Sequence, residues 1–403
     1  MFEDIKTLDD LNFKGKTVLL RLDLNSPIDP KTGEFIDDRR FWLHKETLLE
    51  LVKKGAKIVI LAHQGRPGDS DFTTLEKHAV RLSEIIGKRV TYVDSLFSSY
   101  AKEKVKAMKN GDLVMLENVR FYAEENENRP ADAQTKTFVI KKLAGIGDIF
   151  VNDAFSVSHR SQPTVVGFTR LMPSCAGRLL EKELEALGKV TKNPKKPVTF
   201  ILAGGKAADS FKIMQKALDG NIDYVLTGGI VSHIFLAAKG YNLGEPTMVY
   251  IKGKGLEPHI EIAKELLKKY EGKIVMPVDV ALNENGERIE IPVSELPKNF
   301  PIYDIGSQTI DNYFRIIKGS GTIFAHATMG VIEDEKFAIG TQKIIMAIAG
   351  SGAFSVLGGG HTIASARELG VDKRISYISS GGGAAVTLLA GEKLPGVEAL
   401  RSK

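Results

Sequence analysis

The sequence of 403 residues lacks the features that mark several classes of protein. It has one cysteine, Cys175, and no run of the roughly 20 apolar residues that a bilayer span requires. A single cysteine cannot form a disulfide within the chain, which fits a reducing compartment, and no local signature of a catalytic thiol surrounds it, so we expect a buried structural residue. The N-terminus MFEDIKTLDD is acidic where a signal peptide would be basic and then apolar. We therefore expect a cytoplasmic protein with no membrane partner.

The sequence also lacks a large excess of either positive or negative charge. The net charge is only +5, and the chain has no tract of Lys and Arg. A mildly basic protein of this kind attracts small anions and gives little reason to expect nucleic-acid binding. No fixed-period repeat interrupts the sequence, and its length suits two domains of about 150 to 200 residues each.

Short apolar runs alternate with longer amphipathic stretches along most of the chain. The runs are TVLLRLD, KIVILA, RVTYV, LVMLE and DIFVND in the first half, and VTFILA, YVLTGG, TMVYI, KIVMPVD, TIFAHA, FSVLGGG and RISYISSGGG in the second. Strands buried on both faces read as continuous apolar runs, and their alternation with helices predicts parallel, doubly wound sheets. Between the halves, RLLEKELEALGKV reads as one amphipathic helix before the breaker cluster TKNPKKP. The sequence predicts an α/β protein of two Rossmann-like domains, 1–177 and 198–403, joined by a central hinge helix and linker at 178–197.

The carboxyl ends of the predicted strands, where open α/β sheets bind their ligands, differ between the two halves. In the first half they read RLDLN, AHQGRP, ENVRF and VNDAFSVSHR, and they carry Asp23, Asn25, His63, Arg66, Arg120, His159 and Arg160. In the second half they read LAGGK, LTGG, HATMG, LGGGHT and SSGGG, which are mostly glycine with the single lysine Lys206.

These two sets of strand ends suit different ligands. Arginine binds a small, highly charged anion through bidentate, charge-assisted hydrogen bonds. Glycine lets backbone N–H groups approach closely, and a helix that begins there adds its positive end, which suits the polyphosphate of a nucleotide. We therefore predict that one domain binds a small acid, that the other binds a nucleotide, and that a phosphoryl group is transferred between them. A nicotinamide enzyme is disfavoured, because GSGAFS at Gly350 lacks the last glycine of a dinucleotide fingerprint and precedes its strand.

Several segments resemble, in order and spacing, the signatures of the phosphoglycerate kinase family. They are RLDLNSP, AHQGRP, LENVRF, VNDAFSVSHR, AGGKAADS, MGVIEDEKFAIGT, GGGHT and SSGGGAAVTLLAGEKLPGVEAL, and they extend from about Lys16 to Leu400. HQGRP and GGGHT look like the archaeal branch of that family. The resemblance implies an enzyme that transfers a phosphoryl group reversibly between ATP and the carboxylate of 3-phosphoglycerate, giving ADP and 1,3-bisphosphoglycerate, by direct in-line transfer after hinge closure.

The resemblance also implies roles for particular residues. The first domain would bind 3-phosphoglycerate through Asp23, Leu24, Asn25, Arg40, His63, Gln64, Gly65, Arg66, Arg120 and Arg160. The second would bind the nucleotide through Gly204, Gly205, Lys206, Gly228, Gly229, Glu333, Gly358, Gly359, Gly360, His361 and Thr362. Arg40, Lys206 and Gly382 would be catalytic, with Arg39 as the alternative to its neighbour Arg40. The extreme C-terminus would pack back on the first domain.

Magnesium would arrive with the nucleotide, as Mg-ATP or Mg-ADP. His361 stands where most members of the family have an aspartate, and imidazole is a poor ligand for this hard cation, so we assign no protein ligand to the metal. Ser210 stands where a second lysine is common, and whether Lys212 replaces it is open. We expect a monomer or a homodimer. The alternatives left open are another small-acid kinase, a phosphohistidine enzyme that uses His63 or His159, and a hinge-closing binding protein without catalysis.

Overall fold

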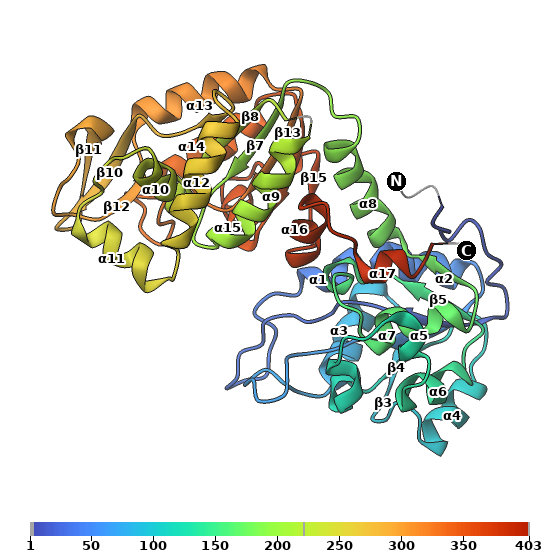
Figure 1. Ribbon diagram of the computed structural model, residues 1–403. Helices are drawn as coiled ribbons and strands as arrows, with labels where there is room; N and C mark the ends of the chain where they lie inside the picture. Colours follow the sequence, from blue (N-terminus) through green and yellow to red (C-terminus); the bar gives the residue numbers. More distant parts are fainter. Residues whose placement is uncertain (1–3, 221, 402–403) are drawn as a thin grey trace. The chain divides into compact units, whose positions relative to one another are not determined.

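A computed structural model describes residues 4–220 and 222–401 and divides the chain into two α/β units (Figure 1). Unit 1 is formed within residues 1–185 and 393–403, and unit 2 within residues 186–392. The division falls inside α8 (Arg178–Thr191), where the sequence predicts the connecting helix. No helix of the described residues is both long enough and apolar enough to cross a membrane.

Unit 1 is built on a parallel sheet of six strands in the order β3–β4–β2–β1–β5–β6. The strands are β1 (Thr17–Arg21), β2 (Lys57–Leu61), β3 (Val90–Val93), β4 (Leu113–Leu116), β5 (Ile149–Asn152) and β6 (Ser174–Ala176). Successive side chains point to opposite faces of a strand, so Val18 and Leu20 enter one hydrophobic core while Leu19 enters the other. Both faces are covered, which explains why the central strands read as unbroken apolar runs.

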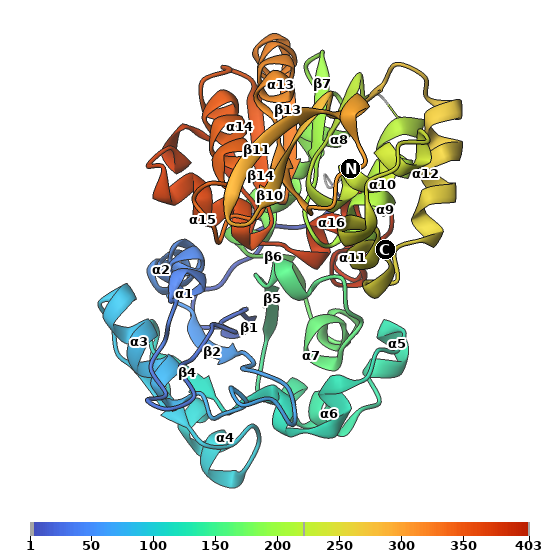
Figure 2. The same ribbon diagram turned by 90° about the vertical axis from the view of Figure 1, so that its left-hand side faces the viewer.

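Helices cover both faces of this sheet. Helices α2 (Lys45–Lys53) and α3 (Glu76–Ile86) supply one core, and α4 (Ser99–Lys106) and α6 (Phe138–Ala144) supply the other, so α3 and α6 lie on opposite sides of the strands (Figure 2). The remaining helices are the short α1 (Arg39–Leu43), α5 (Ala131–Gln134), α7 (Pro163–Val166) and α17 (Pro395–Glu398).

The C-terminal segment belongs to unit 1. Helix α17 packs on α7, and Gly396 N of α17 donates to Ser158 O, in the segment before α7, at 2.9 Å. Arg401, near the C-terminus, forms an ion pair with Asp4, near the N-terminus. The chain thus returns to the unit in which it began.

Unit 2 contains a second parallel sheet and a smaller antiparallel one. The parallel sheet has the order β15–β14–β13–β7–β8–β9, with β7 (Val198–Leu202), β8 (Tyr224–Thr227), β9 (Ile274–Val275), β13 (Thr322–His326), β14 (Phe354–Gly358) and β15 (Tyr377–Ile378). The antiparallel sheet has the order β11–β10–β12, with β10 (Asp279–Glu284), β11 (Glu287–Pro292) and β12 (Ile302–Ile305). The predicted fold class, two doubly wound parallel α/β domains, is confirmed; the antiparallel sheet was not predicted.

One strand prediction is wrong. The run TMVYI lies in helix α11 (Glu245–Gly253), not in a strand. Pro246 occupies the first turn of this helix, where its missing N–H needs no partner and its fixed φ favours helix formation. A short apolar run alone does not distinguish a strand from a helix segment.

The other helices of unit 2 again cover both faces of the parallel sheet. They are α9 (Ala207–Asp219), α10 (Gly229–Ala238), α12 (Pro258–Lys269), α13 (Ser307–Gly319), α14 (Ile339–Ala349), α15 (Gly360–Glu368) and α16 (Gly383–Leu389). Helices α13 and α14 pack in one core with Ile201 and Ile323 of the sheet. On α9 and α10, Phe211 and Phe235 stack with ring centroids 5.4 Å apart.

Candidate functional site

The loops at the carboxyl ends of β1 and β2 are tied together in unit 1. The two strands are neighbours in the sheet. Gly65 N donates to Asn25 Oδ1 at 2.8 Å, and Ser26 N donates to Gln64 Oε1 at 3.1 Å. Because β4 and β5 flank this pair in the sheet, the loops that carry the predicted polar residues meet at one edge.

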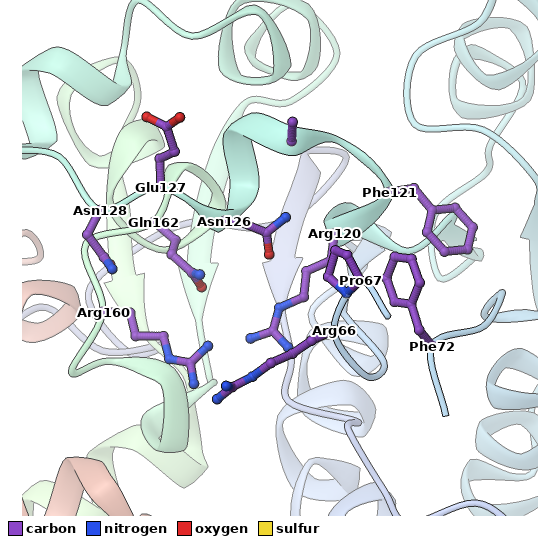
Figure 3. Close-up of a pocket in the computed structure, with 11 residues that line it drawn as sticks. Arg66, Pro67, Phe72, Arg120, Phe121, Asn126, Glu127, Asn128, Arg160 and Gln162 are labelled. Carbon is purple, nitrogen blue, oxygen red and sulfur yellow. The ribbon is translucent and has the colours of Figure 1, made fainter. Parts of the chain in front are cut away.

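A cavity of about 790 Å³ opens at this edge and contains three of the predicted arginines. Figure 3 shows the guanidinium groups of Arg66, Arg120 and Arg160 directed toward one another. Arg120 is buried, its Nη1 donates to Gly65 O at 2.5 Å, and its Nε is enclosed without a partner among the described residues. The rest of the wall consists of Pro67, Phe72, Phe121, Ala123, Asn126, Glu127, Asn128 and Gln162.

The positively charged side chains of this cavity repel one another. Burial, with repulsion from Arg160 and Arg21, lowers the pKa of Arg120 to about 10. Burial, with repulsion from Arg66, also lowers the pKa of Arg160. Guanidinium groups carry a positive charge in proteins, so an anion that enters the cavity relieves a repulsion already present. The cavity is therefore suited to a small anion of high charge.

His63 is held in one tautomer by Arg21, a residue for which the sequence analysis predicted no role. Arg21 Nη2 lies 3.1 Å from His63 Nδ1, and a guanidinium can only donate, so Nδ1 accepts and the ring proton lies on Nε2. Burial, followed by the charge of Arg21, lowers the pKa of His63 well below its ordinary value, which keeps the ring neutral. Arg21 is a charged residue at the end of the otherwise apolar strand TVLLR, and this position in the sequence could have indicated a functional role.

Asp23 forms a second polar group, with Arg40 and Ser156. Its Oδ2 accepts hydrogen bonds from Arg40 Nη1 and Ser156 Oγ, and its Oδ1 accepts from Asn25 N at 3.1 Å. Burial alone would raise the pKa of Asp23, but the charge of Arg40, with the hydrogen bonds from Ser156 Oγ and Asn25 N, outweighs it and lowers the pKa below its usual range. The neighbouring Arg39 instead pairs with Asp37, so Arg40 is the arginine that meets Asp23. Ser156 was not predicted, and no pattern in the sequence distinguishes it.

The carboxyl edge of the parallel sheet in unit 2 consists of glycine turns. Gly229 has a φ of +52°, and a Cβ there would lie 2.7 Å from Gly204 N and 3.0 Å from Thr328 O. Two backbone segments thus approach so closely that only glycine fits. His326 ends β13 and pairs in register with Leu202 of β7 and Gly358 of β14, so the glycine turns after these two strands flank the same position.

A cavity of about 450 Å³ lies at this edge of unit 2. It is lined by Gly204, Gly205, Gly229, Ile230, His233, Pro246, Thr247, Tyr250, Pro301, Ile302, Tyr303, Thr328, Gly330 and Val331. No charged side chain is among these residues. An uncharged cavity of this size, with several apolar walls, suits a flat organic ring.

The predicted nucleotide residues fall into two groups in the structure. Gly204, Gly205 and Gly229 line the cavity, and the exposed Lys206 directly precedes helix α9. The other predicted residues do not line it: Gly228, Glu333, Gly358, Gly359, Gly360, His361 and Thr362. Glu333 and His361 are exposed, whereas Thr362 is buried in the first turn of α15. His233 also lines the cavity, although no sequence motif includes it.

A cationic cavity at the edge of one parallel sheet and a glycine-lined cavity at the edge of another define a class of protein, the two-domain phosphotransferases. A family model described as "Phosphoglycerate kinase" matches residues 8–392. The chain belongs to the phosphoglycerate kinase family, and it is accordingly a kinase that transfers a phosphoryl group to a carboxylate.

Individual relatives agree with this assignment. The chain is 48% identical over 395 residues to a phosphoglycerate kinase of Methanothermus fervidus, covering 98% of this chain and 96% of the relative. It is 49% identical over 395 residues to that of Methanobacterium bryantii, with the same coverage of both chains. Among solved structures, the phosphoglycerate kinase of Pyrococcus horikoshii superimposes with a TM-score of 0.90 at 44% identity, covering 98% of each chain. These three relatives are archaeal, in agreement with the prediction from the HQGRP and GGGHT segments.

Proposed function

We propose that unit 1 holds 3-phosphoglycerate and unit 2 holds ATP or ADP, and that the phosphoryl group passes directly between them. The observation that carries this proposal is the convergence of Arg66, Arg120 and Arg160 in one cavity of unit 1. A phosphate monoester satisfies three guanidinium groups through charge-assisted hydrogen bonds, which a neutral ligand does not. His63 adds a neutral donor, Nε2–H, near the same edge of the sheet.

The second polar group of unit 1 would hold the reacting end of the acid. Asp23 and Asn25 offer acceptors and an amide to the glycerate hydroxyl, and Arg40 offers a guanidinium to the carboxylate. This carboxylate is already ionised near neutral pH, so the reaction requires no general base. The work left to the protein is in-line positioning and the supply of positive charge around the equatorial oxygens of the moving group.

On unit 2, Lys206 would supply charge to the transferred phosphoryl group. It stands at the start of α9, where the unpaired backbone N–H groups also attract anions. The turns around Gly359 and Gly382 would bring further N–H groups to the phosphates, since α15 and α16 begin there. Because acceptor and donor bind to different units, closure about the hinge would bring them to about 3 Å and exclude water.

The described part of the chain offers magnesium no ready set of side-chain ligands. Among residues 4–220 and 222–401, no group of three or more His, Cys, Asp or Glu side chains is placed to hold a metal ion. His361 is exposed in the first turn of α15 and offers nitrogen where Mg²⁺ favours oxygen. We propose that the ion enters with the nucleotide, and no step of the transfer is assigned to it.

The phosphohistidine alternative is not favoured. His63 is buried, its Nδ1 accepts from Arg21, and its Nε2 carries the proton. Neither nitrogen is then a free nucleophile.

We also propose a reducing location for this protein. Cys175 is buried and unpaired, and burial raises the pKa of its thiol, which suits a reducing location such as the cytoplasm. We expect a monomer or a homodimer.

A coupled assay with ATP and 3-phosphoglycerate tests the proposed roles. Arg40→Ala and Lys206→Ala should each lower kcat by about 100-fold or more, because each removes charge that acts on the transition state. Both variants should keep the circular dichroism spectrum of the wild type. Arg39→Ala is the matched control for Arg40, and it should lower kcat far less. A phosphoenzyme trapped from ATP alone would contradict direct transfer.

A further inference from the structure

His233 presents an unused hydrogen-bonding group to the cavity of unit 2. It lies on α10, directly beyond the glycine turn at Gly229, and only 8% of its surface is exposed. Neither ring nitrogen has a hydrogen-bond partner among the described residues, and Nδ1 is fully enclosed. Buried polar groups are normally paired, so a buried imidazole without a partner at a cavity wall points to a ligand.

The position of the ring proton follows from this enclosure. An N–H that is buried without an acceptor is rarer, and more costly, than a buried lone pair. The proton of the neutral ring is therefore on Nε2, the nitrogen that is not enclosed. Burial lowers the pKa of His233 to about 4, so the ring is neutral near pH 7. Nε2–H is thus a neutral donor available to an occupant of the cavity.

The rest of the wall limits the chemistry of that occupant. Apolar side chains from Ile230, Pro246, Pro301 and Val331 suit the faces of a flat ring. The wall has no carboxylate to accept the N–H groups that guanine presents on its Watson–Crick edge, whereas adenine carries ring nitrogens that only accept. A neutral donor in an uncharged cavity matches adenine better than guanine.

We propose that His233 is a specificity residue, which donates its Nε2–H to a ring nitrogen of the adenine of the bound nucleotide. This inference rests on the proposed binding of ATP or ADP by unit 2. It adds an imidazole N–H to a cavity whose other polar side chains are the hydroxyls of two threonines and two tyrosines.

Analogues of ATP that lack one ring nitrogen test the contact. The KM for ATP, 1-deaza-ATP, 3-deaza-ATP and 7-deaza-ATP would be measured with the wild type and with His233→Phe, which keeps a flat ring without a donor. In the wild type, the KM for one of the three analogues should be about 3- to 10-fold higher than the KM for ATP, which is the effect of one lost hydrogen bond. His233→Phe should raise the KM for ATP by a similar factor, lose the discrimination against that analogue, and leave kcat at saturating ATP within about twofold of the wild type.

His259→Phe is the matched control. His259 also has an enclosed Nδ1 without a partner, but it packs against Phe211, with ring centroids 5.1 Å apart, and is not part of the cavity wall. This variant should keep the wild-type pattern with all four nucleotides. His233→Gln, which keeps an N–H donor, should recover part of the discrimination and serves if the Phe variant does not fold.

The possible outcomes distinguish failure of the His233 contact from failure of the nucleotide site. The inference would be overturned if His233→Phe had the same KM for ATP as the wild type. It would also be overturned if the KM ratio between the deaza analogue and ATP were equal in the two proteins. Neither result would affect the kinase function. Failure of the wild type to bind any adenine nucleotide in calorimetry would instead overturn the proposed nucleotide site itself, and this inference with it.

Discussion

His44 Nδ1 lies 2.7 Å from Asp153 Oδ2, and both side chains are buried in unit 1. The other oxygen of Asp153 accepts from Leu179 N at 2.9 Å, in the first turn of α8. His44 Nε2 in turn lies 3.1 Å from Asp23 N. A single chain of hydrogen bonds therefore joins the loop of Asp23 to the start of α8, by way of the residue that separates α1 from α2.

Breaking this pair should destabilise unit 1. His44→Ala removes the hydrogen bond that Nδ1 donates to the buried Asp153 carboxylate, and we expect the free energy of unfolding to fall by about 2 kcal/mol or more. Urea unfolding followed by the fluorescence of Trp42, the only tryptophan and a residue of unit 1, measures the change. Glu34→Ala is the control, because the pair of Glu34 and Lys77 is exposed and should contribute under about 1 kcal/mol. Equal losses in the two variants would contradict the assigned role.

His78 should make unit 1 sensitive to acid. It is fully buried, its Nε2 lies 3.0 Å from Gln64 Oε1, and burial lowers its pKa to about 3. As the pH falls below 6.5, His78 becomes protonated in the unfolded chain but stays neutral in the folded state. Protonation therefore stabilises the unfolded chain, and part of the stability present at neutral pH is lost.

The size of this effect follows from linkage. At pH 5 the loss from His78 alone should be about 2 kcal/mol. Urea unfolding of the wild type and His78→Leu at pH 7.5 and pH 5 measures it, and the variant should show a shallower dependence by that amount, whatever its stability at pH 7.5. The prediction fails if the two proteins lose equal stability over this interval.

Gly229→Ala should damage unit 2 in two ways. The new Cβ would lie 2.7 Å from Gly204 N, and a φ of +52° is unfavourable for alanine, so we expect a loss of more than about 1 kcal/mol together with weaker ATP binding. Scanning calorimetry and titration calorimetry measure these two effects. Gly253→Ala, in α11 with nothing within 4 Å of the new Cβ, should leave both quantities unchanged or slightly improve stability. A tolerated Gly229→Ala would mean that the two backbone segments can separate.

Binding of both substrates should compact the molecule. Reaction needs donor and acceptor within about 3 Å, and the proposed sites lie on separate units. Small-angle scattering should therefore give a smaller radius of gyration with Mg-ADP and 3-phosphoglycerate together than with either alone. An unchanged radius with both would argue against hinge closure.

Much of the molecule followed from local pattern. Strands buried on both faces must be apolar throughout, so TVLLR and KIVIL were recognisable without any knowledge of their neighbours. Parallel strands also present their carboxyl ends at one edge, so Arg66, Arg120 and Arg160 could be expected to meet there. The two kinds of strand end, cationic and glycine-rich, indicated two different ligands from residue type alone.

Tertiary structure decided the rest, because burial and partnership depend on which distant segments pack together. TMVYI has the composition of a strand, yet it forms a helix beside the unpredicted antiparallel sheet. Arg21, His44 and Asp153 look ordinary in sequence and gain their importance from partners far along the chain. His233 is one histidine on an apolar helix, and only the enclosure of its ring beside a cavity makes its unpaired nitrogen informative. Residue type and spacing determined what could bind at the sheet edges, whereas the fold alone decided which polar groups are desolvated and therefore which ones must be paired.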